Sequence, residues 1–180
     1  MGEKMIPVVY RDYPEVPYLS PDRDVEAWER TPEKFPYGVV ARTQMKRLPE
    51  GLLPGHIIML WRVHFGTFTT NSFFPRYFEY RYGVDGREVL NTLTEKGYIR
   101  LSSARESADL LSVPFLKRLL VAHGLPTSGK KAELLEQYRK LSDKEIEGEF
   151  DERRYVITPE GSTVLARYDN IIQRHGPKNL

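Results

Sequence analysis

Hydrophobic residues recur at helical spacing on both sides of a short polar loop in the middle of the chain. The apolar positions before the loop are three and four residues apart, which predicts a helix: Val113, Leu116, Leu119 and Leu120. Ser112 is placed to cap this helix, with Pro114 in the first turn, where a missing N–H costs nothing. Gly124 suits the left-handed position that ends a helix.

A second helix is expected after the loop. It is predicted to start near Thr127 or Ser128 and to turn four residues inward: Ala132, Leu134, Leu135 and Tyr138. Each of the two helices is too short to be stable in isolation. The pattern therefore predicts that they pack on each other and form a small unit.

Longer apolar patterns lie on either side of this unit. They predict helices over 56–68, 72–82 and 85–97, a strand over 98–101, a strand over 153–157, and a last helix from Pro159, capped by Thr158. In the last helix one stripe holds the apolar side chains: Val164, Leu165, Tyr168, Ile171 and Ile172. This stripe fits packing against the rest of the domain, and the alternative is the seam of a dimer.

Two segments differ from the rest in composition. Residues 1–36 carry six prolines and several aromatic residues, which predicts an extended arm that lies on its own domain or on a neighbour. Residues 142–152 are mostly acidic and are predicted to form a connector.

Basic charge is concentrated in the two-helix segment. From Ser112 to Lys140 there are six basic and two acidic residues, a net charge of +4, whereas the whole chain carries +2. Neutralising phosphates with such residues releases counterions, which favours binding to nucleic acid. The backbone N–H groups of residues 128–131 are further expected to form an anion site at the start of the second helix.

The loop also resembles a nucleotide-binding P-loop at first sight. Gly124, Gly129 and Lys130 match the pattern G-x-x-x-x-G-K-[ST], but Lys131 stands where a hydroxyl must bind Mg²⁺. The preceding segment is an amphipathic helix rather than a buried strand. We therefore do not expect nucleotide hydrolysis.

The sequence from Leu116 to Glu136, LKRLLVAHGLPTSGKKAELLE, resembles the SAP motif, a helix–extended loop–helix module that binds nucleic acid. Gln137 and Tyr138 depart from the family pattern, which often has Arg and Leu there. The resemblance implies phosphate contacts from four basic residues and hydrogen bonds from the loop. The residues concerned are Lys117, Arg118, Lys130 and Lys131 for the first, and Thr127, Ser128 and Gly129 for the second.

The flanking elements resemble a winged helix-turn-helix, because three helices lead into "GYI" and a strand, and "YVITPEG" looks like the end of the wing. The expected fold is mainly α with a small β wing (α+β). It comprises the arm 1–36, a winged-helix-like domain of 37–110 and 153–175, an inserted SAP-like module 111–141 and the connector 142–152. Helix 85–97 would then be the recognition helix, with Arg87, Asn91 and Lys96 as secondary DNA-binding residues. The alternative is a scaffold or protein-contact role, because the acidic residues on the same surface would repel phosphate: Asp85, Glu88 and Glu95.

Other classes of protein find less support. The sequence has no cysteine and no apolar run long enough for a membrane span, so we expect no membrane association and an intracellular, cytoplasmic location, associated with the nucleoid if the protein is bacterial or phage-encoded. His56 and His64 stand eight residues apart, whereas a metal pair on one helix stands four apart. We expect no cofactor, no metal and no catalytic residue.

The leading hypothesis is therefore a non-enzymatic protein that binds nucleic acid, DNA rather than RNA, with a weak sequence preference that would favour A·T-rich duplexes. The whole chain looks most like the SAP-domain proteins of phages and mobile elements. The alternative is an assembly protein that binds a protein partner, or a second copy of itself, through residues 1–36 and 158–175.

Overall fold

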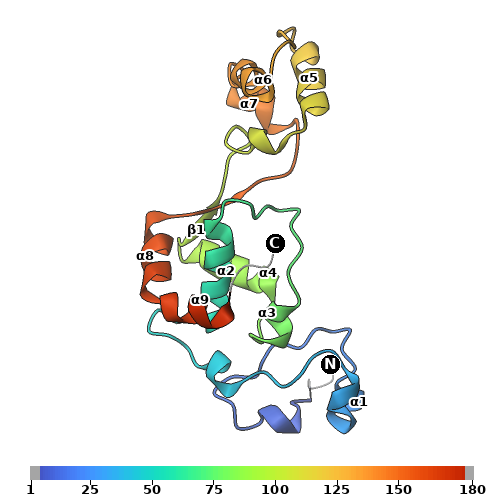
Figure 1. Cartoon of the computed structure of the whole chain (residues 1–180), viewed down its shortest axis with the longest axis vertical. Helices are drawn as coiled ribbons and strands as arrows, with labels where there is room; N and C mark the ends of the chain where they lie inside the picture. The colour runs from blue at the N-terminus through green and yellow to red at the C-terminus, as the bar shows by residue number, and fades with distance from the viewer. Residues whose placement is uncertain (1–4, 177–180) are drawn as a thin grey trace. The chain divides into compact units, whose positions relative to one another are not determined.

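A computed structural model describes residues 5–176 and divides the chain into two compact units (Figure 1). Unit 1 comprises Met1–Phe65, Phe73–Ile99 and Ile157–Leu180, and unit 2 comprises Gly66–Ser72 and Arg100–Val156. The described part is mainly helical, with one small two-stranded sheet, as predicted.

The helices of unit 1 lie at both ends of the sequence. They are α1 (Val25–Arg30), α2 (Pro54–His64), α3 (Tyr77–Tyr80), α4 (Gly86–Glu95), α8 (Pro159–Arg167) and α9 (Asp169–His175), with three short 3-10 turns, η1 (Val8–Tyr10), η2 (Pro32–Lys34) and η3 (Arg42–Met45). Unit 2 contains η4 (Ala108–Leu110), α5 (Val113–Ala122), α6 (Lys131–Tyr138) and α7 (Asp143–Glu147).

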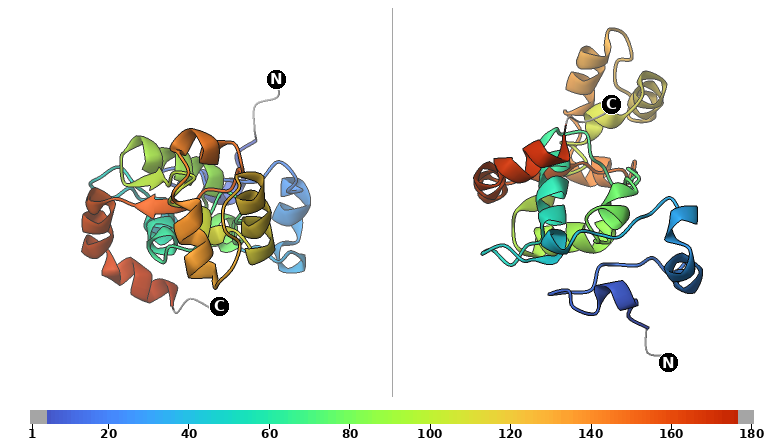
Figure 2. Two further views of the ribbon diagram at one scale, coloured as in Figure 1. Left: turned by 90° about the horizontal axis from the view of Figure 1, so that it is seen from above. Right: turned by 60° about the horizontal axis from the view of Figure 1, so that its bottom comes forward.

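The core of unit 1 is built around α2, which is apolar on nearly every face. Ile57, Ile58, Met59 and Leu60 are fully buried, and α4, α8 and α9 all pack against this helix (Figures 1 and 2). Val164 and Leu165 of α8 and Ile171 of α9 are buried as well. Part of the apolar stripe predicted near the C-terminus is therefore covered within the chain.

The described part of the arm, residues 5–36, packs on its own domain. Tyr10 and Trp28 are buried, and the Tyr10 hydroxyl accepts a hydrogen bond from the Val40 N–H at 3.1 Å. The guanidinium of Arg23 lies 4.0 Å from the centre of the Tyr37 ring and 3.0 Å from Glu79. A buried cation held between an aromatic face and a carboxylate fixes the arm in place.

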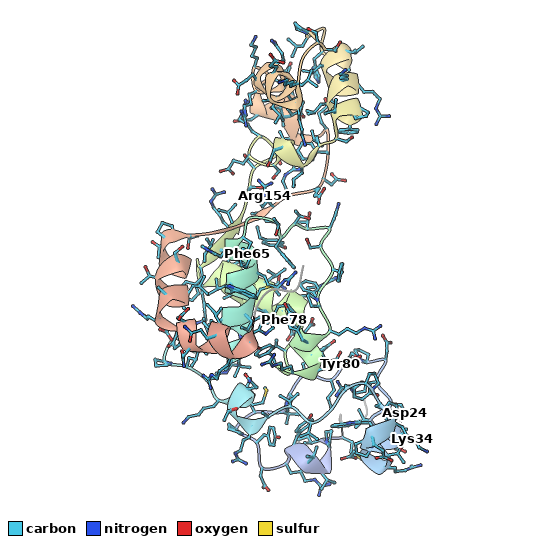
Figure 3. All side chains as sticks on the ribbon, viewed as in Figure 1. Asp24, Lys34, Phe65, Phe78, Tyr80 and Arg154 are labelled. Atoms are coloured by element: carbon cyan, nitrogen blue, oxygen red, sulfur yellow. The ribbon has the colours of Figure 1, made fainter. Side chains whose placement is uncertain are left out.

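The two strands, β1 (Ile99–Leu101) and β2 (Tyr155–Ile157), pair in an antiparallel sheet, close to the predicted ranges. The Thr158 N–H donates to the Tyr98 carbonyl at one end, and the Ser102 N–H donates to the Arg154 carbonyl at the other. Residues 68–70 run alongside 153–155 through an antiparallel bridge between Thr69 and Arg154. Arg154 lies in the chain that leads into β2 (Figure 3).

Three predicted helices of unit 1 are wrong in extent. The helix predicted over 56–68 runs from Pro54 to His64. The helix predicted over 72–82 is only the single turn α3, because Pro75 disfavours helical backbone at the residue before it. Phe78 of this turn is buried (Figure 3), whereas Phe73 is 84% exposed. The last helix is broken at Tyr168, whose backbone (φ −116°, ψ 33°) separates α8 from α9.

Unit 2 has a hydrophobic core of its own, to which α5, α6 and α7 all contribute. Leu116, Leu120, Leu134 and Tyr138 are fully buried in it. The segment for which the sequence predicted an acidic connector contains α7, and Ile146 of that helix is fully buried in the same core. A single apolar residue, flanked by acids that face solvent, was too weak a pattern to predict this helix.

His56 at the start of α2 gives unit 1 an expected sensitivity to acid. Burial, followed by the positive charge of Arg47, lowers the pKa of His56 to about 4, and its Nδ1 accepts a hydrogen bond from the Leu53 N–H at 3.1 Å. Between about pH 6.5 and pH 4 the unfolded chain takes up a proton that the folded chain excludes, so stability falls as the pH falls. We expect this group to remove roughly 3 kcal/mol between pH 7 and pH 4.

Denaturant unfolding as a function of pH checks this expectation. His56→Gln, which retains an acceptor for the Leu53 N–H, should flatten the pH dependence in this window. His64→Gln, at an exposed position of the same helix, should leave it unchanged. Equal slopes for wild type and His56→Gln would contradict the assignment.

The second expectation concerns α7. Ile146→Ala should destabilise unit 2 by about 2–5 kcal/mol, because it leaves a cavity in the core shared by three helices. Hydrogen exchange of the full chain should show faster exchange of the amides of α5 and α6. Lys144→Ala, at an exposed position of α7, should change exchange little. Unchanged protection in Ile146→Ala would show that α7 does not support the other two helices.

Candidate nucleic-acid interface

The first helix of the candidate site forms as its sequence predicts. The side chain of Ser112 accepts a hydrogen bond from the Phe115 N–H, and α5 begins at Val113 with Pro114 in its first turn. The helix ends at Ala122, and Gly124 just after it has a φ of 66°, the left-handed conformation expected there. Leu116, Leu119 and Leu120 face the core, which leaves Lys117 and Arg118 exposed.

The second helix begins later than predicted. α6 starts at Lys131 rather than near Thr127 or Ser128, so residues 126–130 form an extended loop. Gly129 has a φ of 108°, which a helix cannot contain. Ala132, predicted to point inward, is exposed, whereas Leu134, Leu135 and Tyr138 are buried as predicted.

The start of α6 is already capped by a carboxylate. Glu133 Oε2 accepts a hydrogen bond from the Lys130 N–H at 2.6 Å. A Cβ at position 129 would lie 2.3 Å from this same oxygen, so glycine allows Glu133 to approach the loop. The expectation that residues 128–131 all present free N–H groups at a helix N-terminus is therefore wrong, because 128 and 129 precede the helix and the N–H of 130 is occupied.

Lys131 ties the start of α6 to the turn before α5. Its Nζ donates a hydrogen bond to the Asp109 carbonyl at 2.6 Å, and Asp109 precedes the Ser112 cap by three residues. The N-termini of both helices therefore lie near η4. Helix N-termini carry partial positive charge, which adds to the charge of the nearby lysines.

Five of the ten acidic residues of unit 2 form ion pairs with its own arginines. Ion pairs link Arg100 to Glu106 (2.9 Å), Arg105 to Asp143 (2.9 Å), Arg139 to Glu136 (2.7 Å), Arg153 to Glu147 (3.5 Å) and Arg154 to Asp109 (2.8 Å). His123 Nε2 lies 2.7 Å from Glu149. The hydrogen bond from Arg100 lowers the pKa of Glu106 to about 2, and that from Arg154 lowers the pKa of Asp109.

The cations predicted to contact phosphate are not among these pairs. Within residues 5–176, no ion pair involves Lys117, Arg118, Lys130 or Lys131. Lys117 and Lys130 are exposed, Arg118 stacks over the Phe115 ring with its Cζ 5.1 Å from the ring centre, and Lys131 bonds only to a carbonyl. The module therefore presents unneutralised positive charge on α5, in the loop and at the start of α6.

The remaining predicted residues fall into two places. Thr127 and Ser128 lie in the extended loop, where neither side chain bonds to any described residue, so both hydroxyls are available to a ligand. Arg87 and Asn91 are exposed on α4 of unit 1, and Lys96 Nζ donates to the Glu50 carbonyl at 3.3 Å. Asp85, which caps α4, and Glu88 share the first turn of that helix with Arg87.

Arg105 is a residue that the sequence did not single out. Its guanidinium donates to the Arg139 and Leu141 carbonyls in the turn between α6 and α7, the second at 2.5 Å, and its Nε donates to Asp143 of α7 at 2.9 Å. Arg105 thereby satisfies two carbonyls of this turn and fixes the end of α6 next to α7. Its partners lie 34 to 38 residues away, so no local pattern marks it.

Comparison with known families supplies the remaining observation. Residues 108–143 match the SAP domain family. Residues 108–143, called the SAP segment below, contain α5, the loop, α6 and the turn that Arg105 contacts. The match connects the chain with nucleic-acid binding in general. No curated protein and no solved structure matches the chain.

Neither a metal centre nor a membrane span is found in residues 5–176. Within this range no group of three His, Cys, Asp or Glu residues is arranged to hold a metal ion. None of the helices found there has the length and apolar character needed to cross a bilayer.

Arg105 should stabilise the SAP segment through the carbonyls rather than through its ion pair. Arg105→Met should lower the free energy of unfolding of unit 2 by roughly 1–3 kcal/mol, because it removes charge-assisted hydrogen bonds to two carbonyls. Asp143→Asn should cost only about 0–1 kcal/mol, since the Asp143 side chain is 85% exposed. Chemical denaturation of both variants measures the difference, and equal losses would show that the ion pair matters as much as the carbonyls.

Proposed function

We propose that this chain is a non-enzymatic DNA-binding protein that contacts the phosphates of a duplex through its SAP segment. The observation that carries this proposal is the difference in unit 2 between basic side chains that form ion pairs and those that do not. Five arginines are paired with carboxylates, whereas Lys117, Arg118 and Lys130 meet no carboxylate and face solvent. Unpaired cations of this kind bind phosphates by releasing counterions.

The loop supports contacts that position the duplex without reading its sequence. Thr127 and Ser128 offer hydroxyls beside Lys130, and hydroxyls and lysines bind phosphate oxygens irrespective of the base. Any preference should then come from the shape of the DNA, and we propose a bias to the narrow minor groove of A·T-rich duplexes. Duplex DNA rather than RNA, and action in the cytoplasm or at the nucleoid, are parts of the same proposal.

The order of elements in the chain supports a winged-helix-like host for the SAP segment. Helix α2 is followed by the bridged residues 68–70, then by α3, α4, β1 and β2. In such a fold α4 would be the recognition helix, with Arg87, Asn91 and Lys96 as secondary contacts. The acidic side chains of Asp85 and Glu88 make α4 the weaker of the two candidate surfaces.

The proposal predicts weaker binding by Lys117→Ala/Lys130→Ala. Both residues are exposed and unpaired, so the double variant should fold normally and bind a 20-bp duplex at least about tenfold more weakly. The slope of log affinity against log salt should fall in magnitude by about 2, one for each phosphate that is no longer neutralised. Fluorescence anisotropy with A·T-rich and G·C-rich duplexes, and with an RNA duplex, measures these quantities.

Lys34→Ala/Lys144→Ala is the matched control, because it removes the same charge from two exposed lysines outside the loop and α5. It should bind as wild type does. If both double variants lose affinity equally, binding depends on net charge and not on the SAP segment. If wild type fails to bind any duplex at low salt, the proposal is wrong.

A second candidate is an assembly protein, for example a phage or mobile-element component. The exposed apolar side chains of the arm favour it: Met5, Ile6, Val8, Val9 and Val16 are 41–63% exposed. Apolar patches of this kind mark protein-interaction surfaces. Binding of a partner there should be insensitive to salt, in contrast to the binding of phosphates.

A further inference from the structure

Unit 1 contains a cleft of about 400 Å³ whose lining includes four basic side chains and no acidic one. Lys46 and Arg47 come from the segment that follows η3, Arg81 from the end of α3 and Arg174 from α9. These segments are far apart in the sequence, so the convergence of charge is created by the fold. No residue of the arm (1–36), of the connector (142–152) or of the SAP segment (108–143) lines the cleft.

Two of the four cations are free to bind a ligand. Within residues 5–176, neither Lys46 nor Arg174 is in an ion pair, whereas Arg47 is held by Glu15 at 2.5 Å. Arg81 donates to the carbonyls of Arg174 (2.7 Å) and His175 (3.2 Å), which orients its guanidinium and leaves its charge unneutralised. Like charges gathered in one cleft repel one another, and a bound anion would remove that repulsion.

The rest of the lining is suited to more than a bare anion. Leu48, Pro49 and Tyr168 provide apolar and aromatic surface, and the volume falls in the range of small-molecule sites. The side-chain oxygen of Gln44, which also lines the cleft, is buried and has no hydrogen-bond partner among the described residues. Buried acceptors are normally satisfied, and this oxygen would meet an amino group of a ligand once the Gln44 side chain turned into the cleft.

We propose that this cleft binds a phosphorylated nucleotide, with Lys46, Arg81 and Arg174 on the phosphate and the apolar lining against the base. The nucleotide could be a free molecule or one unit of a single strand, and both present the same chemistry. The site belongs to unit 1, and its existence does not depend on DNA binding by the SAP segment.

Calorimetric titration of the full chain with deoxyadenosine monophosphate, deoxyadenosine and single-stranded dA4 tests the proposal. We expect binding of the monophosphate, of dA4 or of both, and none of the nucleoside, which lacks the phosphate. Binding of the monophosphate identifies a free nucleotide as sufficient, and binding of dA4 alone identifies the strand as the source. Equal binding of the nucleoside, or no binding of either phosphate-bearing ligand at millimolar concentration, would overturn the proposal.

Variants separate this site from the SAP segment. Lys46→Gln/Arg174→Gln should weaken binding at least tenfold, whereas the control Lys34→Gln/Arg76→Gln, at exposed positions of unit 1 outside the cleft, should not. Lys117→Ala/Lys130→Ala should keep its affinity for the same ligand. If dA4 binding is lost in that variant and kept in the cleft variant, the strand binds the SAP segment and the cleft proposal is wrong.

Chemical-shift mapping of the wild type avoids any effect of the substitutions on folding. The ligand should shift the amide signals of Lys46, Asn170 and Arg174. Shifts confined to residues 127–131 would overturn the proposal.

Discussion

Unit 2 depends on one constraint, which is that α5 and α6 are too short to be stable alone. Their apolar faces must share a core, and two short helices supply too little of it. The core therefore recruits Ala104 and Ala108 before α5 and Ile146 after α6. Burial of Tyr138 in this core also raises the pKa of its hydroxyl to about 12. The loop between α5 and α6 is held in position because both of its ends are fixed by this core.

The same constraint decides which charges remain for a ligand. Packing the flanking segments against α5 and α6 brings arginines from positions 105, 153 and 154 to carboxylates and carbonyls. Arginine suits these contacts because its planar fork can satisfy several acceptors at once. The lysines of the loop and of α5 take no part in holding the core. The charge available for phosphate is therefore set by the pairing within the unit, and the net charge of the chain is a poor guide to it.

Local signals in the sequence predicted α5, both strands and the start of α8, because caps such as Ser112 and Thr158 act within three or four residues. The start of α6 was predicted too early, because the spacing of apolar residues does not reveal that Gly129 takes a positive φ. α3 was predicted too long, because the helical spacing of the aromatic residues was given more weight than Pro75. Ile146, Arg105 and the basic cleft could not be predicted, since their partners come from distant parts of the sequence. The residues proposed to bind phosphate were predicted through the family resemblance. That their side chains form no ion pairs could be seen only in the structure.

A loop with three or four cations binds nucleic acid weakly, because each phosphate contact contributes modestly and salt reduces the total. Non-specific affinities of this type are on the order of 10⁻⁴ to 10⁻⁶ M at physiological salt. The phosphate site proposed in unit 1 would raise this limit if one strand contacted both sites, since the second contact would then be intramolecular. The gain depends on the chain that joins the sites, which here passes between the units at four points. Two of these four points lie within β1 and β2, so the pairing of these two short strands shortens the free length of chain that joins the units.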